Sequence, residues 1–223
     1  MSAVIPTLDA HCDTIILREV RQDPLDFADA TDRYHVDLPR MRKGGLAATF
    51  VMVGDNRIEQ SIKLVDGVHQ MAATRPKDFA QCRTQSQVRA EAGHVALLMS
   101  VDGQAMVRDE LAAVRNWARR GVTIFSRSHG EARFPAPPDS TALQWDRPFF
   151  GMITPTQRAT LRRQSKGMTP FAKLSVAEVG KLGLIIDLAH ANDTAFDEVL
   201  EMATGPVCVS HGCTYAQCQH ARN

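Results

Sequence analysis

The sequence predicts an α/β fold in which parallel strands build a (β/α)8-type barrel that lacks its last strand–helix units. Apolar runs typical of buried strands alternate with amphipathic helical segments along most of the 223 residues. Histidine and aspartate recur directly after these runs, and a parallel barrel carries its chemistry at the carboxyl ends of its strands. Only six or seven strands can be counted, whereas a closed barrel has eight. Hydrophobic residues make up 44% of the chain, so we expect one domain over residues 1–223.

In the first half of the chain, each predicted element follows from a local pattern. Apolar residues at helical spacing predict a helix that Pro76 ends, and Thr84 is a capping residue that opens a shorter helix. One uninterrupted apolar run is typical of a parallel strand buried on both faces. The predicted strands are 3–9, 46–53, 78–82, 95–101 and 122–125, and the predicted helices are 39–43, 58–74, 84–92 and 109–120.

Residues 126–170 interrupt this alternation. They contain six of the eleven prolines and few periodic signals, so we predict a long, divergent loop there. Loops of this length are often functional lids or variable insertions. Regular alternation then resumes, with predicted helices at 170–182 and 193–203 and predicted strands at 183–188 and 206–209.

The bulk composition argues against several kinds of partner. The net charge is +1 with acidic and basic residues well mixed, which disfavours a nucleic acid or a membrane surface held by charge. No apolar run approaches the roughly 18 residues of a membrane-spanning helix. The amino-terminal segment does not have the pattern of a signal peptide. We therefore expect the five cysteines to be reduced thiols in a cytoplasmic protein.

Two histidines form the best-defined pair of candidate ligands. His190 and His211 each lie two positions after the last aliphatic residue of a predicted strand, and one predicted helix separates these strands. His11 and Asp13 form an i,i+2 pair after the first strand. Imidazole and carboxylate together suit zinc or a related divalent ion. A single histidine at a strand end is more often a hydrogen-bonded rim residue, but four residues at equivalent positions favour a metal site.

Two further polar residues follow apolar runs. Asp102 comes after the most apolar strand, where an ionised carboxylate needs a partner or a metal. It could equally be a turn residue, because Asp102 and Gly103 form a turn dipeptide. His129 follows the strand predicted at 122–125 and is a candidate for the same rim.

Six segments of the chain resemble the membrane dipeptidase (renal dipeptidase) family of binuclear zinc peptidases. They occur in the family's order, cover most of the chain outside 130–167, and the last two are the most specific. The resemblance implies a (β/α)8 barrel that hydrolyses dipeptides or similar small amides with a hydroxide activated by two zinc ions. The segments are DAHCDT (9–14), HVDLPRMRKGG (35–45), SVDG (100–103), GVTIFSRSH (121–129), MTPFAKLSVAEVGKLGLIIDLAH (168–190) and PVCVSHGCTYAQCQHARN (206–223).

The resemblance also implies which residues bind the metal. One zinc would be held by His11 and Asp13, and the other by His190 and His211. Asp102 would be the acid that bridges the two ions and takes part in catalysis.

Two more residues acquire roles from the same resemblance. His129 would contact the substrate and stabilise the developing oxyanion. Arg222 would bind the terminal carboxylate of the substrate, a task that suits a guanidinium fork. Arg222 is also the penultimate residue, so a solvated charge in the tail is the alternative interpretation.

The chain departs from the family in two respects. The bridging acid is usually glutamate, and Asp102 is one methylene shorter, about 1.5 Å less in reach. We expect two zinc ions per site, or one if Asp102 cannot bridge. The chain also ends at Asn223, before further strand–helix units that contribute a proton-handling aspartate in the family. An open barrel has unpaired strand edges, so we expect either a fragment of a longer protein or closure by another subunit in a homodimer.

Three alternatives to a dipeptidase remain open. The chain could be a metal hydrolase of another small amide, ester or lactone, with its specificity set by the divergent loop. It could be a non-catalytic remnant that binds metal without turnover. The histidines could also be ordinary packing residues, in which case replacing His190 or His211 with alanine would leave the zinc content unchanged.

Overall fold

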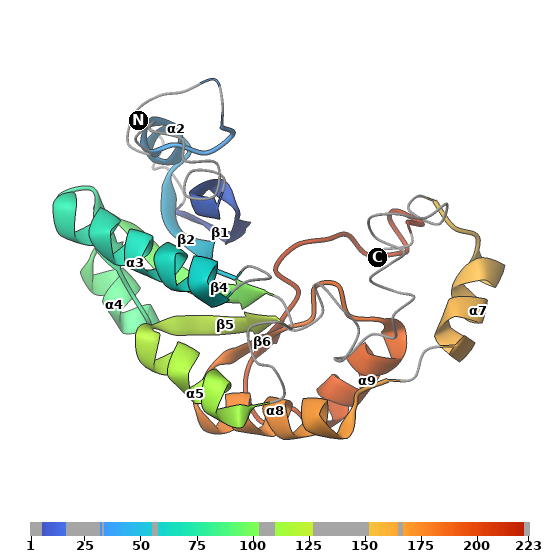
Figure 1. The fold of residues 1–223 in the computed structure, drawn as a ribbon. Coiled ribbons are helices and arrows are strands. Elements are labelled where there is room, and N and C mark those ends of the chain that lie inside the picture. The colour runs from blue at the N-terminus through green and yellow to red at the C-terminus, as the bar shows by residue number, and fades with distance from the viewer. Residues whose placement is uncertain are drawn as a thin grey trace. The chain divides into compact units, whose positions relative to one another are not determined.

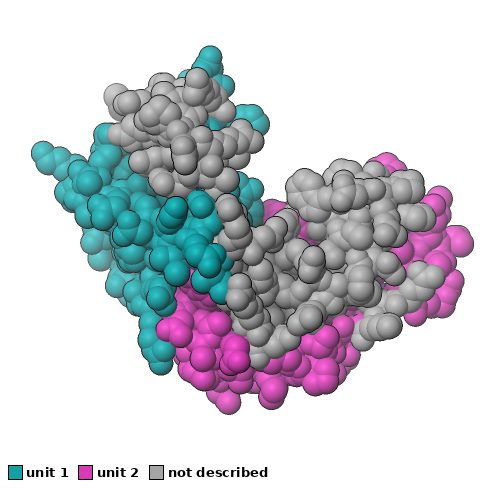
Figure 2. Space-filling view, in the orientation of Figure 1, with its two compact units in different colours: residues 1–101, 119–123 teal, residues 102–118, 124–223 magenta. Residues whose placement is uncertain are grey.

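The computed structural model describes residues 6–16, 32, 34–54, 58–102, 110–126, 152–164 and 167–220 (Figure 1). The chain divides into two compact units, shown in teal and magenta in Figure 2. Unit 1 comprises residues 1–101 and 119–123, and unit 2 comprises residues 102–118 and 124–223. Each unit is described below by itself.

Unit 1 is built from parallel strands with short connecting helices. Strand β2 pairs with β1 and with β4, and β3 pairs with β4, always in parallel. Helix α3 packs on β3, and helix α2 packs on β2. The elements are β1 (Thr7–Cys12), α2 (Leu38–Lys43), β2 (Leu46–Met52), α3 (Ile58–Thr74), β3 (Phe79–Gln81), α4 (Gln85–Ala90) and β4 (Val95–Asp102, of which Asp102 belongs to unit 2).

Local sequence explains the strongest elements of unit 1. All eight residues of β4 are buried, as predicted for a parallel strand covered on both faces. Helix α3 buries Leu64, Val68 and Met71, which lie at helical spacing on one face. Helix α4 begins with a capping box, in which the Thr84 hydroxyl accepts from the backbone of Gln87 and the Gln87 side chain accepts from the backbone of Thr84.

Unit 2 continues the strand–helix alternation. Strand β6 pairs in parallel with β5 on one side and β7 on the other. Helix α8 packs on β6 and on α9. The elements are α5 (Leu111–Arg120) and β5 (Val122–Ser126), which lie partly in unit 1, then α7 (Pro155–Gln164), α8 (Pro170–Lys181), β6 (Ile185–Asp187), α9 (Asp193–Met202) and β7 (Val207–Cys208). The predicted parallel α/β architecture is therefore confirmed.

Two predictions about the elements need correction. The first strand, described over Thr7–Cys12, extends past residue 9, where the prediction ended it, so His11 lies inside it and Asp13 directly follows it. Residues 3–5 of the prediction lie outside the described residues. Its pairing with β2 begins where Thr7 meets Leu46, and the register shifts between Asp9 and Cys12. The strand continues through polar residues beyond the apolar run, so the run alone did not predict where it ends.

The predicted loop over 126–170 contains a helix, α7, at Pro155–Gln164. It was missed because the side chains described on it are not buried, so no apolar stripe marks it. A capping box marks it instead. The Thr154 hydroxyl accepts from the backbone of Gln157 at 3.2 Å, and the Gln157 side chain accepts from the backbone of Thr154 at 2.8 Å.

Ion pairs and stacking hold α7 against the rest of unit 2. The Arg158 guanidinium donates to both carboxylate oxygens of Asp193, at 2.9 and 3.0 Å, and lies 4.0 Å from the centre of the Tyr215 ring. The hydrogen bonds to Asp193 are the main reason that the pKa of Arg158 is raised above its ordinary value. Among the residues that the structure describes, no helix has the length and apolar character needed to cross a bilayer.

Candidate metal centre

The carboxyl ends of β6 and β7 bring two histidines into contact. His190 lies three residues beyond β6 and His211 three residues beyond β7. Their Nε2 atoms are 2.7 Å apart, and their rings meet edge to face with centroids 4.7 Å apart. Because β6 and β7 are parallel neighbours, both residues emerge at the same edge of the sheet, as the strand spacing predicted.

His190 has an unusual backbone. Its φ angle is 69°, and it is the one non-glycine residue with a positive φ in the described part of the chain. The left-handed region costs an ordinary L-residue roughly 1 kcal/mol or more. Such conformations persist only where the surrounding structure holds them, and they cluster at functional sites. The side chain of His190 is buried, so this backbone conformation belongs to a packed residue of unit 2 and not to a solvent-exposed turn.

Asp102 is the third member of the group. It is the last residue of β4 and is buried, and its Oδ2 atom lies 3.7 Å from Nε2 of His190. Asp102, His190 and His211 each offer a ligand atom, and these atoms lie within 4.8 Å of one another. Over the described ranges this is the one group of three or more histidine, cysteine or acidic residues with such spacing.

The geometry of this group fits a zinc ion with small adjustments. Two imidazoles and one carboxylate are a common ligand set for catalytic zinc. With zinc–ligand bonds of about 2.0–2.1 Å, two ligand atoms of a tetrahedron lie roughly 3.3 Å apart. The two imidazole nitrogens at 2.7 Å would have to separate slightly, and the carboxylate at 3.7 Å would have to approach slightly. The third separation, between the ligand atoms of Asp102 and His211, lies within 4.8 Å.

A buried carboxylate supports the group from behind. Asp187 closes β6, and its Oδ1 atom accepts from the backbone N–H groups of Ala189 at 3.0 Å and of Ser210 at 2.9 Å. Its Oδ2 atom accepts from the Ser210 hydroxyl at 2.5 Å. The same hydroxyl oxygen lies 2.7 Å from Nδ1 of His211. Asp187 therefore links the chain ahead of His190 to the chain ahead of His211.

The sequence reasoning did not single out Asp187 or Ser210. The available signal was a carboxylate set directly after the aliphatic pair Ile185 and Ile186, because a buried acid requires hydrogen-bond partners. Burial, and secondarily the charge of Asp187, also raises the pKa of the neighbouring Cys208 thiol to about 12. A thiol with this pKa stays protonated near neutral pH, which makes it a weak nucleophile in the metal-free chain.

The other predicted pair of ligands lies in unit 1. Nε2 of His11 is 3.1 Å from Oδ1 of Asp13, with the His11 side chain largely buried and that of Asp13 exposed. The backbone N–H of His11 donates to Asp9 at 3.2 Å. The structure thus brings His11 together with Asp13, and it brings Asp102 together with the two later histidines. That these two groups bind metal stays a prediction.

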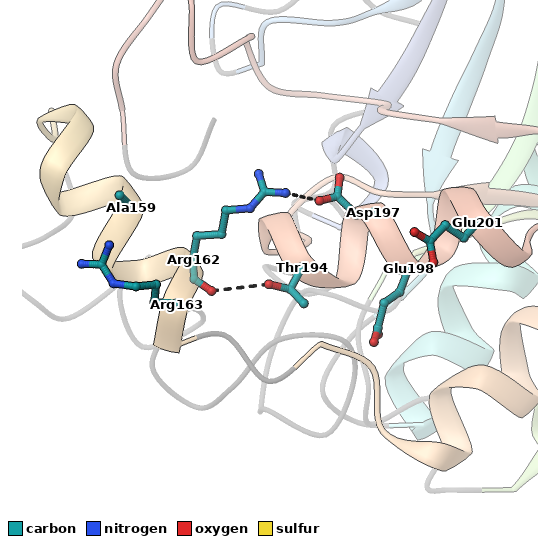
Figure 3. A pocket seen from close by; sticks show the side chains of 7 residues that line it. All are labelled: Ala159, Arg162, Arg163, Thr194, Asp197, Glu198 and Glu201. Atoms are coloured by element: carbon teal, nitrogen blue, oxygen red, sulfur yellow. Dashed lines mark hydrogen bonds and ion pairs between the residues drawn. The ribbon is translucent and has the colours of Figure 1, made fainter.

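Two predicted site residues, His129 and Arg222, lie outside the residues that the structure describes. Their roles toward substrate stay predictions. The described surface is also hollowed between α7 and α9, where Arg162 on α7 pairs with Asp197 on α9 and its carbonyl oxygen accepts from Thr194 (Figure 3). This pocket shares no residue with the histidine group.

Comparison with known proteins decides the family. The family model of membrane dipeptidases (peptidase family M19) matches residues 1–223, the whole chain. The chain belongs to the membrane dipeptidase family. The resemblance seen in the sequence motifs is therefore confirmed, and the ligand geometry described above belongs to a member of a family of metal-dependent dipeptidases.

Curated relatives in this family share about a quarter of the sequence. Dipeptidase 3 of Mus musculus is 24% identical over 228 residues, which is 98% of this chain and 43% of the mouse protein. Dipeptidase aclJ of Aspergillus oryzae is 26% identical over 241 residues, which is 98% of this chain and 53% of the fungal protein. The chain thus spans about half the length of these curated relatives.

Solved structures share the fold. A metallopeptidase from Rhodobacter sphaeroides, bound to a phosphinate mimic of the dipeptide L-Ala-D-Ala, matches 99% of this chain and 69% of its own with a TM-score of 0.77 at 20% identity. An amidohydrolase from Pseudomonas aeruginosa matches 97% of this chain and 55% of its own with a TM-score of 0.70 at 18% identity. The membrane dipeptidase fold is therefore present over part of its length, which confirms the predicted fold class.

Proposed function

We propose that this chain is part of a zinc-dependent dipeptidase and that Asp102, His190 and His211 hold one of its metal ions. The observation that carries this proposal is the convergence of one carboxylate and two imidazoles from three separate segments to within 4.8 Å. One of these residues is held in a strained backbone conformation, with φ of 69°. Membership in the membrane dipeptidase family supplies the reaction class.

Bound zinc would supply a water of lowered pKa and a Lewis acid that polarises the scissile carbonyl. The residues of the chain have separate tasks. The two neutral imidazoles and the Asp102 carboxylate hold and orient the ion. His11 and Asp13 are proposed as ligands of a second ion, His129 as a hydrogen-bond donor to the developing oxyanion, and Arg222 as the group that binds the substrate carboxylate.

A dipeptide or a similar small amide is the proposed substrate. Support comes from the Rhodobacter sphaeroides metallopeptidase, whose structure contains a mimic of L-Ala-D-Ala and whose fold matches this chain. We propose the same class of substrate here.

Zinc binding tests the proposal directly. The purified chain is depleted of metal, titrated with zinc and assayed for bound metal by mass spectrometry. We expect at least about one zinc per chain, and we expect His190→Ala and His211→Ala each to abolish tight binding. His69→Ala is the matched control, because His69 is exposed on α3 and is not among the proposed ligands. Unchanged zinc content in the His190 and His211 variants would mean that these histidines only pack.

Turnover of a substrate panel tests the reaction. We expect zinc-dependent release of amino acids from dipeptides, L-Ala-D-Ala included, and little turnover of lactones or N-acyl amino acids. The opposite preference would favour a metal hydrolase of another class. Tight zinc binding without turnover of any panel member would favour the second candidate, a non-catalytic metal-binding protein. One observation supports that candidate, namely that Asp102 is shorter than the glutamate expected for a bridging acid.

A further inference from the structure

The hydrogen bonds of Asp187 have a fixed direction. Its Oδ1 atom accepts from two backbone N–H groups, those of Ala189 and Ser210, which can only donate. An ionised carboxylate can only accept. In the contact of 2.5 Å between Oδ2 and the Ser210 hydroxyl, the hydroxyl therefore donates its hydrogen to the carboxylate. All three contacts are thus satisfied by a charged Asp187, and hydrogen bonds of this kind are shorter and stronger than neutral ones.

The direction at Asp187 determines the direction at His211. Ser210 has one hydroxyl hydrogen, and it is used toward Asp187. In the contact of 2.7 Å between the Ser210 oxygen and Nδ1 of His211, the serine must therefore accept and the imidazole must donate. A neutral imidazole with hydrogen on Nδ1 has a free lone pair on Nε2. Nε2 is the atom that faces Nε2 of His190.

From this geometry we propose that Asp187 and Ser210 are positioning residues that lock His211 in the tautomer able to bind metal through Nε2. The inference rests on the proposed metal site for its purpose, but the tautomer itself is a property of the metal-free chain. Groups of this kind, behind the metal ligands, fix ring orientation and raise ligand basicity. Their loss typically lowers metal affinity about 10- to 100-fold.

Asp187 also positions the second imidazole through the backbone. It holds the N–H of Ala189, the residue that immediately precedes His190 and its left-handed backbone. It also accepts from the backbone N–H of Ser210, the residue that immediately precedes His211. One buried carboxylate therefore sets the approach of both rings, and removing it should disturb both ligands at once.

The hydrogen-bonded chain from Asp187 through Ser210 to His211 is tested first in the metal-free protein. Long-range proton–nitrogen NMR spectra of a ¹⁵N-labelled sample report which ring nitrogen of each histidine carries hydrogen. We expect His211 to be in the Nδ1–H form in the parent chain and a mixture of forms in Ser210→Ala. Ser210→Thr retains a hydroxyl and should retain the single tautomer. A parent His211 in the Nε2–H form, or an unchanged tautomer in Ser210→Ala, would overturn the inference.

Zinc competition with a chromogenic chelator gives the second readout. We expect Ser210→Ala to bind zinc 10- to 100-fold more weakly than the parent, Ser210→Thr to bind within a few-fold of it, and Asp187→Asn to bind at least as weakly as Ser210→Ala. Ser86→Ala, an exposed serine of unit 1, is the matched control. A cooperative thermal unfolding transition shows that each variant is folded. If Asp187→Asn does not fold, the zinc affinity of Ser210→Ala alone decides the test.

The two proposals fail in different ways. If the parent chain binds no zinc, the proposed function fails while the NMR experiment still decides the tautomer. If the parent binds zinc and Ser210→Ala binds it equally well, the positioning role is refuted and the metal site stands.

Discussion

Removing the charge of Asp102 is the most direct test of its proposed role as a zinc ligand. Asp102→Asn replaces the carboxylate with an amide of nearly the same shape, so packing at the end of β4 is retained. The Oδ2 atom lies 3.7 Å from Nε2 of His190, about 0.4 Å more than the roughly 3.3 Å between two ligands of a tetrahedral zinc. The ligand atoms of Asp102 and of both histidines lie within 4.8 Å of one another, and the asparagine variant removes the negative charge that the carboxylate brings to this group.

The expected loss can be bounded from below. Removing a group behind the ligands costs about 10- to 100-fold in metal affinity, and Asp102 is proposed as a ligand itself. We therefore expect Asp102→Asn to weaken zinc binding at least about 100-fold, or ~2.8 kcal/mol at 1.4 kcal/mol per factor of ten. Asp102→Glu keeps the charge but moves it by about 1.5 Å, so its affinity should fall between those of the parent and Asp102→Asn unless a second ion is gained.

Zinc titration against a chromogenic chelator measures both variants, and the ratio of zinc to protein shows whether Asp102→Glu gains an ion. The unfolding midpoint of the metal-free proteins serves as the control, and it should change little because the asparagine fills the same space. Zinc binding by Asp102→Asn that equals that of the parent would refute the assignment of Asp102 as a ligand. The two histidines would then need a different third partner.

Three other predictions concern the stability and reactivity of unit 2. Arg158→Lys keeps the charge but loses the two-pronged hydrogen bond to α9, so urea unfolding should show a loss of about 1 kcal/mol; no change would mean that α7 is held by other contacts. The pKa of about 12 for Cys208 predicts that iodoacetamide at pH 8 labels the exposed Cys213 and not Cys208, and equal labelling would contradict it. Because that pKa is raised above the ordinary thiol value near 9, the stability it contributes is complete below about pH 9 and falls as the pH rises toward 12. Gly167→Ala should cost more stability than Gly183→Ala, since both have φ near +68° but only at Gly167 would a Cβ lie 2.7 Å from a glutamate carboxylate; equal losses would show that the glutamate moves aside freely.

Sequence patterns predicted the elements that owe their form to local chemistry. Helix α3 was predicted with its observed bounds because its apolar residues repeat at helical spacing and Pro76 follows it. Strand β4 was predicted because a strand buried on both faces must be apolar throughout. Helix α7 was missed because ion pairs, and no apolar stripe, hold it, and such pairs depend on residues distant in sequence, as Arg158 and Asp193 show.

The candidate site also contains residues that the sequence predicted and residues that it did not. Asp102, His190 and His211 could be predicted to converge because parallel strands release their carboxyl ends at one edge. Asp187 and Ser210 could not, because their link depends on the register of β6 and β7, in which Asp187 lies opposite Cys208. The left-handed backbone of His190 was not predicted either, because histidine is only several-fold enriched in that conformation, which is too weak a signal to single out one residue.

Strands β6 and β7 are short for the task they perform. They have three and two residues, and their paired register covers two positions, Ile186 with Val207 and Asp187 with Cys208. Backbone hydrogen bonds from Ile186 to Pro206 at 3.0 Å and from Leu188 to Cys208 at 2.8 Å flank this register. A ladder of this length leaves the segments beyond it free to splay, yet the two imidazoles are in contact. The Asp187 carboxylate continues the pairing past the strand ends with two hydrogen bonds to Ser210, while a third, from Ala189, fixes its own segment. The histidine pair is therefore held together before any ion binds, and zinc would have to open the imidazoles by a fraction of an ångström without gathering them from separate loops.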